Sequence, residues 1–313
     1  MNHKPAALQK GDTVGVIAPA SPPDEEKLAR GVDFIESLGL KVKKGKYVDS
    51  RYGYLAGRDH ERLEDLHTMF QDHEVKAILC ACGGYGTGRL AEKINYDIIR
   101  QHPKIFWGYS DITFLHTAIH QQTGLITFHG PMLSSDVGKK DVHSITKETF
   151  LQLFSPDSFT YTEQLSELTT VHDGTASGEI IGGNLALIVT TLGTPFEIDT
   201  KGKLLLIEDI DEEPYKIDRM LQHLKSSGKL QDAAGFMIGD FHQCEPKKRE
   251  HSLTLEQLWE SYILSEKKPA LSGFQIGHSS PNIGIPIGTN AVLDATGKQL
   301  HISPGVTAKE AIK

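Results

Sequence analysis

Short apolar runs alternate with amphipathic segments along the first half of the chain. Helical spacing is clearest where Leu28, Val32, Ile35 and Leu38 fall on one face, and Asp24 precedes that segment as a favoured N-cap. The strand-like runs are 13–21, 46–48, 77–84, 104–110 and 126–131, and the helical patterns are 24–39, 58–71, 88–94 and 111–122. Repeated strand–helix units of this kind predict an α/β domain built on a mainly parallel sheet.

The pattern changes between residues 154 and 177, where the chain is polar and rich in hydroxyl side chains. We interpret 155–176 as an inter-domain linker, because it has little apolar periodicity. Strand-like runs then resume at 178–184, 203–210, 233–241 and 270–278, with helical patterns at 214–228 and 253–264. The last two runs, 291–296 and 298–303, predict an antiparallel pair across the turn from Ala295 to Gly297. We therefore expect an N-terminal α/β domain over 1–154 and a smaller, mixed α/β domain over 177–313.

Composition and charge narrow the classes of partner. The 313 residues are enough for two cores, and 38% hydrophobic with 24% charged residues is typical of a globular protein. The net charge of -8 leaves no broad cationic surface for a nucleic acid. The first residues lack the apolar run of a secretory signal, and no stretch approaches the roughly 20 apolar residues that span a bilayer. We expect a cytoplasmic protein with neither nucleic acid nor membrane as a partner.

The segment from Lys104 to Gln122 has the pattern of a nucleophile elbow. An apolar strand stops at Gly108, passes through Ser110 and continues at once into an amphipathic helix. The sequence keeps the first glycine of G-x-S-x-G, but Ile112 stands where the last glycine is expected. The pattern thus indicates a nucleophilic serine beside a helix N-terminus, where developing negative charge is favoured. The alternative is that Ser110 simply caps the helix.

A glycine-rich turn from Cys82 to Arg89 follows another apolar run. It does not match the phosphate-binding motifs, because no Lys-Ser or Lys-Thr follows and Arg89 replaces the third glycine of G-x-G-x-x-G. We interpret Gly83 and Gly84 as main chain that approaches a substrate closely and offers an N–H group to an oxyanion. A tight turn without a chemical role is the alternative.

Two further candidates lie in the second half. Glu208 ends the apolar run 203–208, where it could be partly buried and orient an imidazole. His278 closes another apolar run and opens a loop rich in Gly and Pro, the usual place for catalytic groups. Helix-dipole stabilisation explains the neighbouring acids 211–213 without catalysis, and a lone loop histidine is often a surface residue.

The histidine spacings do not predict a metal site. His116 and His120 are four residues apart, as in a zinc pair, but the segment lacks the glutamate of H-E-x-x-H and no third ligand is evident. We therefore interpret both as packing or surface residues and expect no metal.

Four motifs, taken in order, resemble the LD-carboxypeptidase family. They are CGGYGTGRL at 82–90, GYSDIT at 108–113, IEDIDEEPYKIDRML at 207–221 and GHSSPNIGIPIGTNAVLD at 277–294, and the likeness begins at Gly11. The family comprises serine peptidases of murein recycling and includes microcin-immunity peptidases as relatives. Four ordered motifs over nearly the whole chain are far more specific than any one of them.

The resemblance implies a role for each candidate. Ser110 is then the nucleophile, Glu208 the acid of the triad and His278 the general base, with the active site between an N-terminal α/β domain and a smaller C-terminal domain. The family's oxyanion donors correspond to the N–H of Asp111 and one from the Gly83–Gly84 turn.

The resemblance also implies a substrate and an assembly. The family's usual substrate is the murein tetrapeptide, cut between the L-centre of a diamino acid and the terminal D-alanine, without any cofactor. Arg89 is a candidate partner for the substrate carboxylate, or else a helix-surface residue. A homodimer is expected.

Two alternatives remain open at this point. A microcin-type immunity peptidase would cleave a peptide–nucleotide conjugate with the same triad, although the glycine-rich turn is more similar to the recycling branch. A two-domain binding module would close around a small molecule without chemistry.

Overall fold

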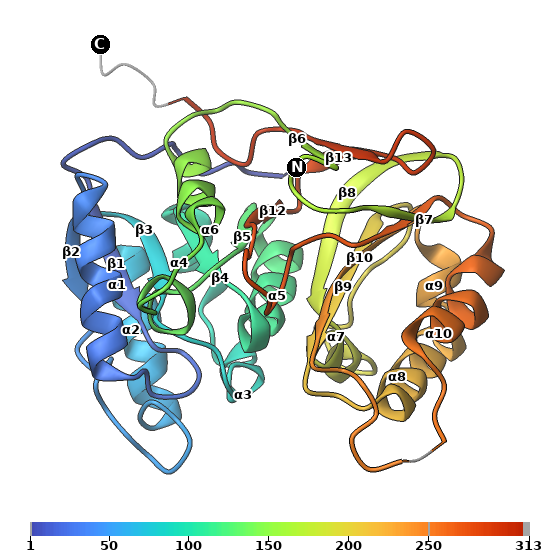
Figure 1. Cartoon of the computed structure of the whole chain (residues 1–313). Helices are drawn as coiled ribbons and strands as arrows, with labels where there is room; N and C mark the ends of the chain where they lie inside the picture. Colours follow the sequence, from blue (N-terminus) through green and yellow to red (C-terminus); the bar gives the residue numbers. More distant parts are fainter. Residues whose placement is uncertain (1, 250, 309–313) are drawn as a thin grey trace. The chain divides into compact units, whose positions relative to one another are not determined.

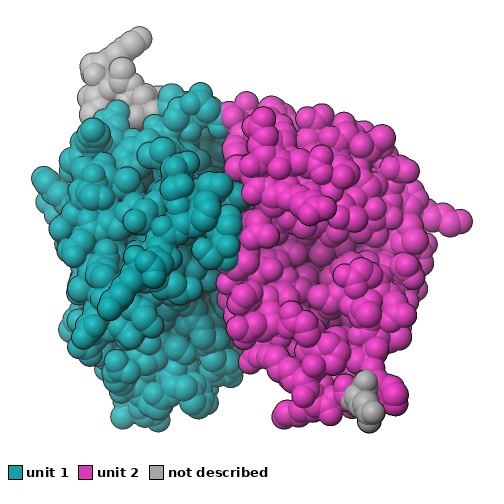
Figure 2. Space-filling model, in the orientation of Figure 1, with its two compact units in different colours: residues 1–157, 280–288, 304–313 teal, residues 158–279, 289–303 magenta. Residues whose placement is uncertain are grey.

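The computed structural model describes residues 2–249 and 251–308, which form two compact units. Unit 1 comprises residues 1–157, 280–288 and 304–313, and unit 2 comprises residues 158–279 and 289–303 (Figure 2). Both units mix helices with strands, so the chain has the two-domain α/β architecture that the alternating pattern predicts.

Unit 1 is built on a six-stranded sheet with the order β12-β5-β4-β3-β1-β2 (Figure 1). All neighbouring strands are parallel except β12, which runs antiparallel to β5. The strands are β1 (Thr13–Ile17), β2 (Lys41–Lys44), β3 (Val75–Cys80), β4 (Ile105–Gly108), β5 (Thr127–His129) and β12 (Ile285–Ile287). The predicted mainly parallel sheet is confirmed.

Helices bury apolar residues against both faces of this sheet. Leu28 and Ile35 of α1 join one core cluster with Val14 of β1, whereas Phe70 of α2 joins a second cluster with Ile78 of β3. The helices of unit 1 are α1 (Glu25–Ser37), α2 (Asp59–Gln71), α3 (Gly88–Ala91), α4 (Tyr96–Gln101), α5 (Thr113–Thr123) and α6 (Ser144–Glu148). Because successive strand residues point to opposite faces, β1, β3 and β4 each supply residues to both clusters.

The predicted cap of α1 is confirmed. The N–H of Lys27 donates to Oδ1 of Asp24 at 3.0 Å, and this bond satisfies one of the helix's first amide groups.

Unit 2 is built on an eight-stranded mixed sheet with the order β6-β14-β13-β8-β9-β10-β11-β7. The central strands β8 to β11 are parallel, and the flanking pairs are antiparallel. The strands are β6 (Phe159–Thr162), β7 (Thr169–His172), β8 (Thr175–Asn184), β9 (Leu204–Ile210), β10 (Gly235–His242), β11 (Ala270–Ser272), β13 (Asn290–Asp294) and β14 (Gln299–Ile302). The predicted antiparallel pair near the C-terminus is confirmed as β13 and β14.

Helices of unit 2 cover the parallel part of its sheet. Leu221 of α8 and Trp259 of α10 share a core cluster with Ile207 of β9. The helices are α7 (Leu185–Thr191), α8 (Pro214–Ser226), α9 (Lys229–Asp232) and α10 (Leu255–Tyr262). This core fixes β9, the strand that carries Glu208.

The compact units divide the chain differently from the expected domains. Strands β6 and β7 lie within 155–176 and pair with β14 and β11, so two segments of the expected linker are part of the unit 2 sheet. Tyr161 of β6 is fully buried, which explains why this polar segment is ordered. Residues 280–288 were expected in the C-terminal domain but belong to unit 1, where β12 pairs with β5.

One strand lies away from its expected place. The run at 46–48 is not a strand; the sheet edge is instead β2, whose residues Lys41–Lys44 are mostly exposed. Charged lysines are common on such edges because they discourage pairing with another chain. Among the described residues, every helix is too short or too polar to cross a membrane.

Candidate active site

Ser110 lies in a strained turn between β4 and α5. Its backbone has φ 63°, a conformation that residues other than glycine rarely adopt. A short 3-10 helix (Ser110–Ile112) begins there and runs into α5. No side-chain hydrogen bond caps either helix start in this described turn, so a capping role does not explain Ser110. Backbone strain of this kind is typical of nucleophile elbows.

A buried histidine fixes the strand end that leads into the turn. The carbonyl oxygen of Gly108 accepts hydrogen bonds from His116 Nε2 at 2.7 Å and from the N–H of Gly130 at 3.1 Å. Because a carbonyl can only accept, His116 carries its proton on Nε2. Burial lowers the pKa of His116 to about 4, so its ring is neutral near pH 7. The sequence pattern predicted a packing or surface role for His116 but not this contact.

The glycine-rich turn lies directly against Ser110. A Cβ atom on Gly83 would lie 3.0 Å from Cβ and 3.1 Å from Oγ of Ser110. The turn is held by Ser21, whose N–H donates to Gly83 O and whose Oγ accepts from the N–H of Tyr85, both at 3.2 Å. Gly84 has φ +111°, which explains the second glycine. Sequence reasoning missed Ser21 because it belongs to a separate loop.

Asp111 ties the same turn to the start of α5. Its buried carboxylate accepts from the N–H of Thr87 at 2.9 Å, and its carbonyl oxygen accepts from Thr87 Oγ1 at 2.6 Å. Burial raises the pKa of Asp111, while the bonds from Thr87 oppose that shift. The side chain therefore has a structural role, and the role expected from the resemblance concerns only its main-chain N–H.

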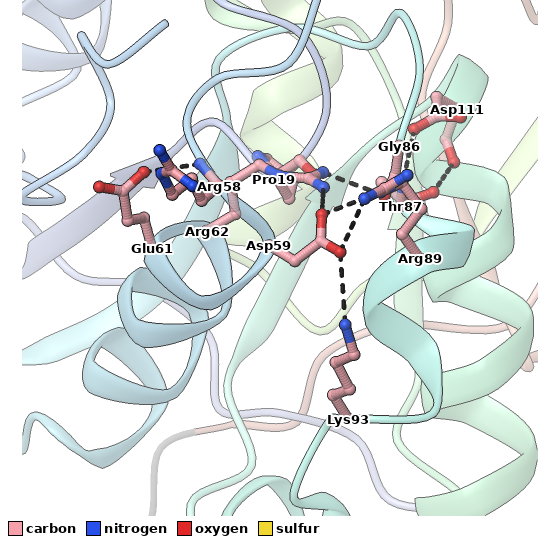
Figure 3. A network of polar contacts seen from close by, with 10 residues as sticks. All are labelled: Pro19, Arg58, Asp59, Glu61, Arg62, Gly86, Thr87, Arg89, Lys93 and Asp111. Atoms are coloured by element: carbon pink, nitrogen blue, oxygen red, sulfur yellow. Dashed lines mark hydrogen bonds and ion pairs between the residues drawn. The ribbon is translucent and has the colours of Figure 1, made fainter. Parts of the chain in front are cut away.

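Arg89 is engaged by a protein carboxylate. Its Nε and Nη2 donate to the two carboxylate oxygens of Asp59 at 2.9 and 3.0 Å, in a bidentate pair (Figure 3). The side chain of Arg89 is 45% exposed, and Asp59 also pairs with Arg62 and Lys93. This geometry supports a place in a protein network and gives no separate support for binding a substrate carboxylate.

Glu208 and His278 form a buried pair in unit 2. His278 Nδ1 lies 2.8 Å from Oε2 of Glu208, and their side chains are 11% and 0% exposed. Since a carboxylate accepts, Nδ1 carries the proton and Nε2 is the basic nitrogen of the neutral ring. The two residues are 70 positions apart in the sequence, and the fold brings them together as the resemblance implied.

Two glycines make room for this pair. A Cβ atom on Gly277, which has φ +136°, would lie 2.8 Å from Oε2 of Glu208. A Cβ on Gly239 of β10 would lie 3.1 Å from Cβ of Glu208 and 2.5 Å from the carbonyl oxygen of Ile276. The glycine immediately before His278 is thus required by the buried acid, which explains the Gly-His dipeptide.

Asp209, next to Glu208, is a buried acid that the sequence reasoning did not single out. Its carboxylate accepts from Asn184 Nδ2 at 2.9 Å and from the N–H of Ala186 at 3.0 Å, so it fixes the start of α7. Burial, assisted by the charge of Glu208, raises the pKa of Asp209 to about 7. Because successive side chains of a strand point to opposite faces, Glu208 and Asp209 lie on opposite faces of β9. Glu208 contacts His278, whereas Asp209 contacts Asn184.

The predicted site residues are thus found in two local groups. Unit 1 holds Ser110 with Gly83, Gly84 and Asp111, whereas unit 2 holds Glu208 with His278. Within the described residues, no group of three or more His, Cys, Asp or Glu side chains could hold a metal ion.

Comparison with known proteins finds a family model that matches each half of the chain. The model of the LD-carboxypeptidase N-terminal domain matches residues 14–130, and that of the C-terminal domain matches residues 177–293. A Bacillus subtilis protein named "Probable murein peptide carboxypeptidase" is 64% identical over 98% of this chain and 96% of its own length. The "Murein tetrapeptide carboxypeptidase" of Pseudomonas aeruginosa is 32% identical over 90% of this chain and 92% of its own.

A solved structure supports the fold assignment. The microcin C7 self-immunity protein in its wild-type apo state aligns with a TM-score of 0.89 at 25% identity. The alignment covers 96% of this chain and 98% of that protein.

Proposed function

The chain belongs to the LD-carboxypeptidase family, and we propose that it hydrolyses the L,D-amide bond of a murein tetrapeptide to release terminal D-alanine. The bond between His278 Nδ1 and Glu208 Oε2, at 2.8 Å, is the observation that carries the proposal. It gives the imidazole the tautomer and orientation that a general base in a serine peptidase requires.

In the proposed mechanism Ser110, Glu208 and His278 act as one triad. Oγ of Ser110 attacks the scissile carbonyl carbon while Nε2 of His278 takes the hydroxyl proton. The tetrahedral intermediate collapses with cleavage of the C–N bond, and the imidazolium returns that proton to the departing amine of D-alanine. Water then attacks the acyl-serine ester with His278 again as base, so that the shortened peptide leaves and Ser110 is regenerated.

The oxyanion is assigned to main-chain donors. The close approach of Gly83 to Ser110 supports an N–H from the Gly83–Gly84 turn as one donor, and the N–H of Asp111 is proposed as the other. Donors of this kind need no metal or organic cofactor. The cytoplasmic location expected from the sequence and the homodimer implied by the resemblance stay predictions.

The second candidate function is hydrolysis of a peptide–nucleotide conjugate, as in the microcin-immunity branch. Identity favours the murein substrate, because the relative named for murein peptides is 64% identical and the aligned self-immunity protein is 25% identical. The same triad would serve both reactions, so only the substrate separates them.

The decisive experiment presents the purified protein with two synthetic tetrapeptides that differ only in the configuration of the terminal alanine. Mass spectrometry should find loss of D-alanine from one and an intact L-alanine peptide in the other. Inversion at the terminal Cα exchanges its methyl and hydrogen, and a misplacement of about 1 Å can cost on the order of a hundredfold in rate. Equal kcat/KM for the two peptides would remove the L,D-specific assignment.

A fluorophosphonate probe separates an enzyme from a binding module. Labelling should occur at Ser110 and should disappear in Ser110→Ala. A protein that binds the tetrapeptide but neither cleaves it nor reacts with the probe would be a binding module.

A further inference from the structure

Two buried side chains tie together the loops that follow three neighbouring strands of unit 1. Strands β1, β3 and β4 are parallel and adjacent, so the loops after them meet at one edge of the sheet. Asp111 links the loop after β4 to the loop after β3 through Thr87. Arg62, from α2, links the loop after β3 to the loop after β1 (Figure 3).

Arg62 makes this second link with a fully buried guanidinium. Its Nη1 donates to the carbonyl oxygens of Pro19 and, at 3.0 Å, of Gly86. Its Nη2 donates to Oδ1 of Asp59 at 2.8 Å. Burial lowers the pKa of Arg62 and Asp59 opposes the shift, so the group stays a cation. Desolvating a guanidinium is costly, and only several well-directed hydrogen bonds offset the cost.

Asp59 keeps the guanidinium in place. Besides Arg62, it accepts from Arg89 and from Lys93, the latter at 3.3 Å (Figure 3). These cations hold the pKa of Asp59 far below its usual range, chiefly through the hydrogen bond from Arg89. Asp59 is therefore an anion near pH 7, and its bonds to Arg62 of α2 and Arg89 of α3 fix these two helices to each other.

The contacts of Arg62 and Asp111 extend to the turn that lies against Ser110, the proposed nucleophile. Gly86 and Thr87 are consecutive residues held by Arg62 and by Asp111, and Gly83, three positions before Gly86, lies against Ser110. We propose that Arg62 and Asp59 are positioning residues, which hold the Gly83–Gly86 turn so that its main-chain N–H groups stay aligned with Ser110. The inference rests on the proposed function of Ser110.

The geometry requires arginine at position 62. The planar guanidinium reaches two carbonyl oxygens with one nitrogen and a carboxylate with another. A lysine ammonium is a compact charge on a flexible stem and cannot fix three acceptors in the same plane. Arg62→Lys should therefore keep the charge and lose the alignment.

The test compares kcat and KM for D-alanine release in Arg62→Ala, Arg62→Lys and Asp59→Asn. We expect kcat to fall about ten- to a hundredfold in each, as for a misplaced oxyanion donor, with KM within about threefold of wild type. Added guanidinium, at low concentrations that leave wild type unaffected, should raise the kcat of Arg62→Ala several-fold. It should not raise the kcat of Asp59→Asn. A purely structural loss would lower the amount of active enzyme and would not respond to guanidinium.

Arg100→Ala is the matched control. Arg100 also pairs with an aspartate three residues earlier, Asp97, and donates to a main-chain carbonyl, but its side chain is exposed on helix α4. Its kcat should equal that of wild type.

Three results would overturn the inference. One is a folded Arg62→Lys or Asp59→Asn protein with wild-type kcat, and another is an equal loss in Arg100→Ala. The third is an Arg62→Ala defect that added guanidinium does not relieve. If Arg62→Ala does not fold, the kcat and KM values of the other two variants decide the matter. A fully active Ser110→Ala protein would instead refute the proposed function, whatever the Arg62 variants do.

Discussion

Adding one methyl group at Gly83 tests the proposed contact between the glycine-rich turn and the nucleophile. A Cβ at this position would lie 3.0 Å from Cβ of Ser110, about 0.5 Å below the lower end of the optimum separation of roughly 3.5–4.0 Å between carbon atoms. Gly83 is not among the glycines with positive φ, so alanine fits its backbone conformation. The methyl group added by Gly83→Ala should therefore displace mainly the Ser110 side chain.

The expected size of the effect follows from that displacement. If about 1 Å of misplacement costs roughly a hundredfold, about 0.5 Å costs roughly tenfold in kcat, or about 1.4 kcal/mol in activation free energy. Overpacking of this kind costs about 1–3 kcal/mol of folding stability, which a stable domain tolerates. Gly83→Ala should stay folded and lose about nine-tenths of its turnover.

The assay measures kcat for D-alanine release and the rate of Ser110 labelling by a fluorophosphonate. Gly88→Ala is the control, because its added Cβ would make an ordinary contact with Phe114 at 3.4 Å, and alanine favours a helical position. The control should keep wild-type values for both rates. The reasoning fails if Gly83→Ala, folded by circular dichroism, keeps wild-type kcat and labelling rate, or if both variants slow equally.

Three further predictions concern the triad, metals and pH. Alanine at Ser110, Glu208 or His278 should remove most turnover without unfolding, and a double variant should lose no more than the worse single; additive losses would contradict a triad. EDTA should leave turnover intact, whereas loss with recovery on adding zinc would reveal a metal site. The pKa of Asp209 is about 7 in the folded protein and 3.8 ordinarily, so between these pH values the folded state keeps a proton that the unfolded state loses. The free energy of unfolding of the wild type therefore falls as pH rises from about 4 to about 7. Asp209→Asn should therefore gain unfolding free energy relative to wild type over that range in urea titrations, and parallel curves would contradict the assignment.

The main elements of the fold could be predicted because their signals are local. Apolar runs and the cap at Asp24 are visible in short windows of sequence. Strands β6 and β7 were assigned to a linker because their sequences, FTYT and TTVH, lack apolar alternation. Threonine and aromatic residues favour strands even when polar neighbours surround them, and that signal was given too little weight. The pairing of β12 with β5 joins residues more than 150 positions apart, which no window can reveal.

The candidate site also contains some residues that sequence motifs reveal and others that only the fold brings together. Ser110 follows the end of β4 by two residues, and His278 follows Gly277 in the loop after β11, which ends at Ser272 and is shorter than the run expected over 270–278. Motif reasoning can find both residues. Asp59 and Arg62 have the spacing of an ordinary exposed helix pair, and the two carbonyl oxygens that Arg62 contacts carry no side-chain signature. Main-chain acceptors are invisible in a sequence, so the network around the turn required the fold.

The division of unit 1 into separate stretches of chain has a consequence for synthesis on the ribosome. Strand β5 is translated early, but its antiparallel neighbour β12 emerges only after nearly all of unit 2. Until then, the nascent unit 1 presents β5 as an open sheet edge, which is prone to pairing with other chains. A gene cut at the boundary near residue 157 would make this exposure permanent, so the first 157 residues expressed alone should aggregate. Supplying residues 280–288 through a short fused linker should reduce that aggregation.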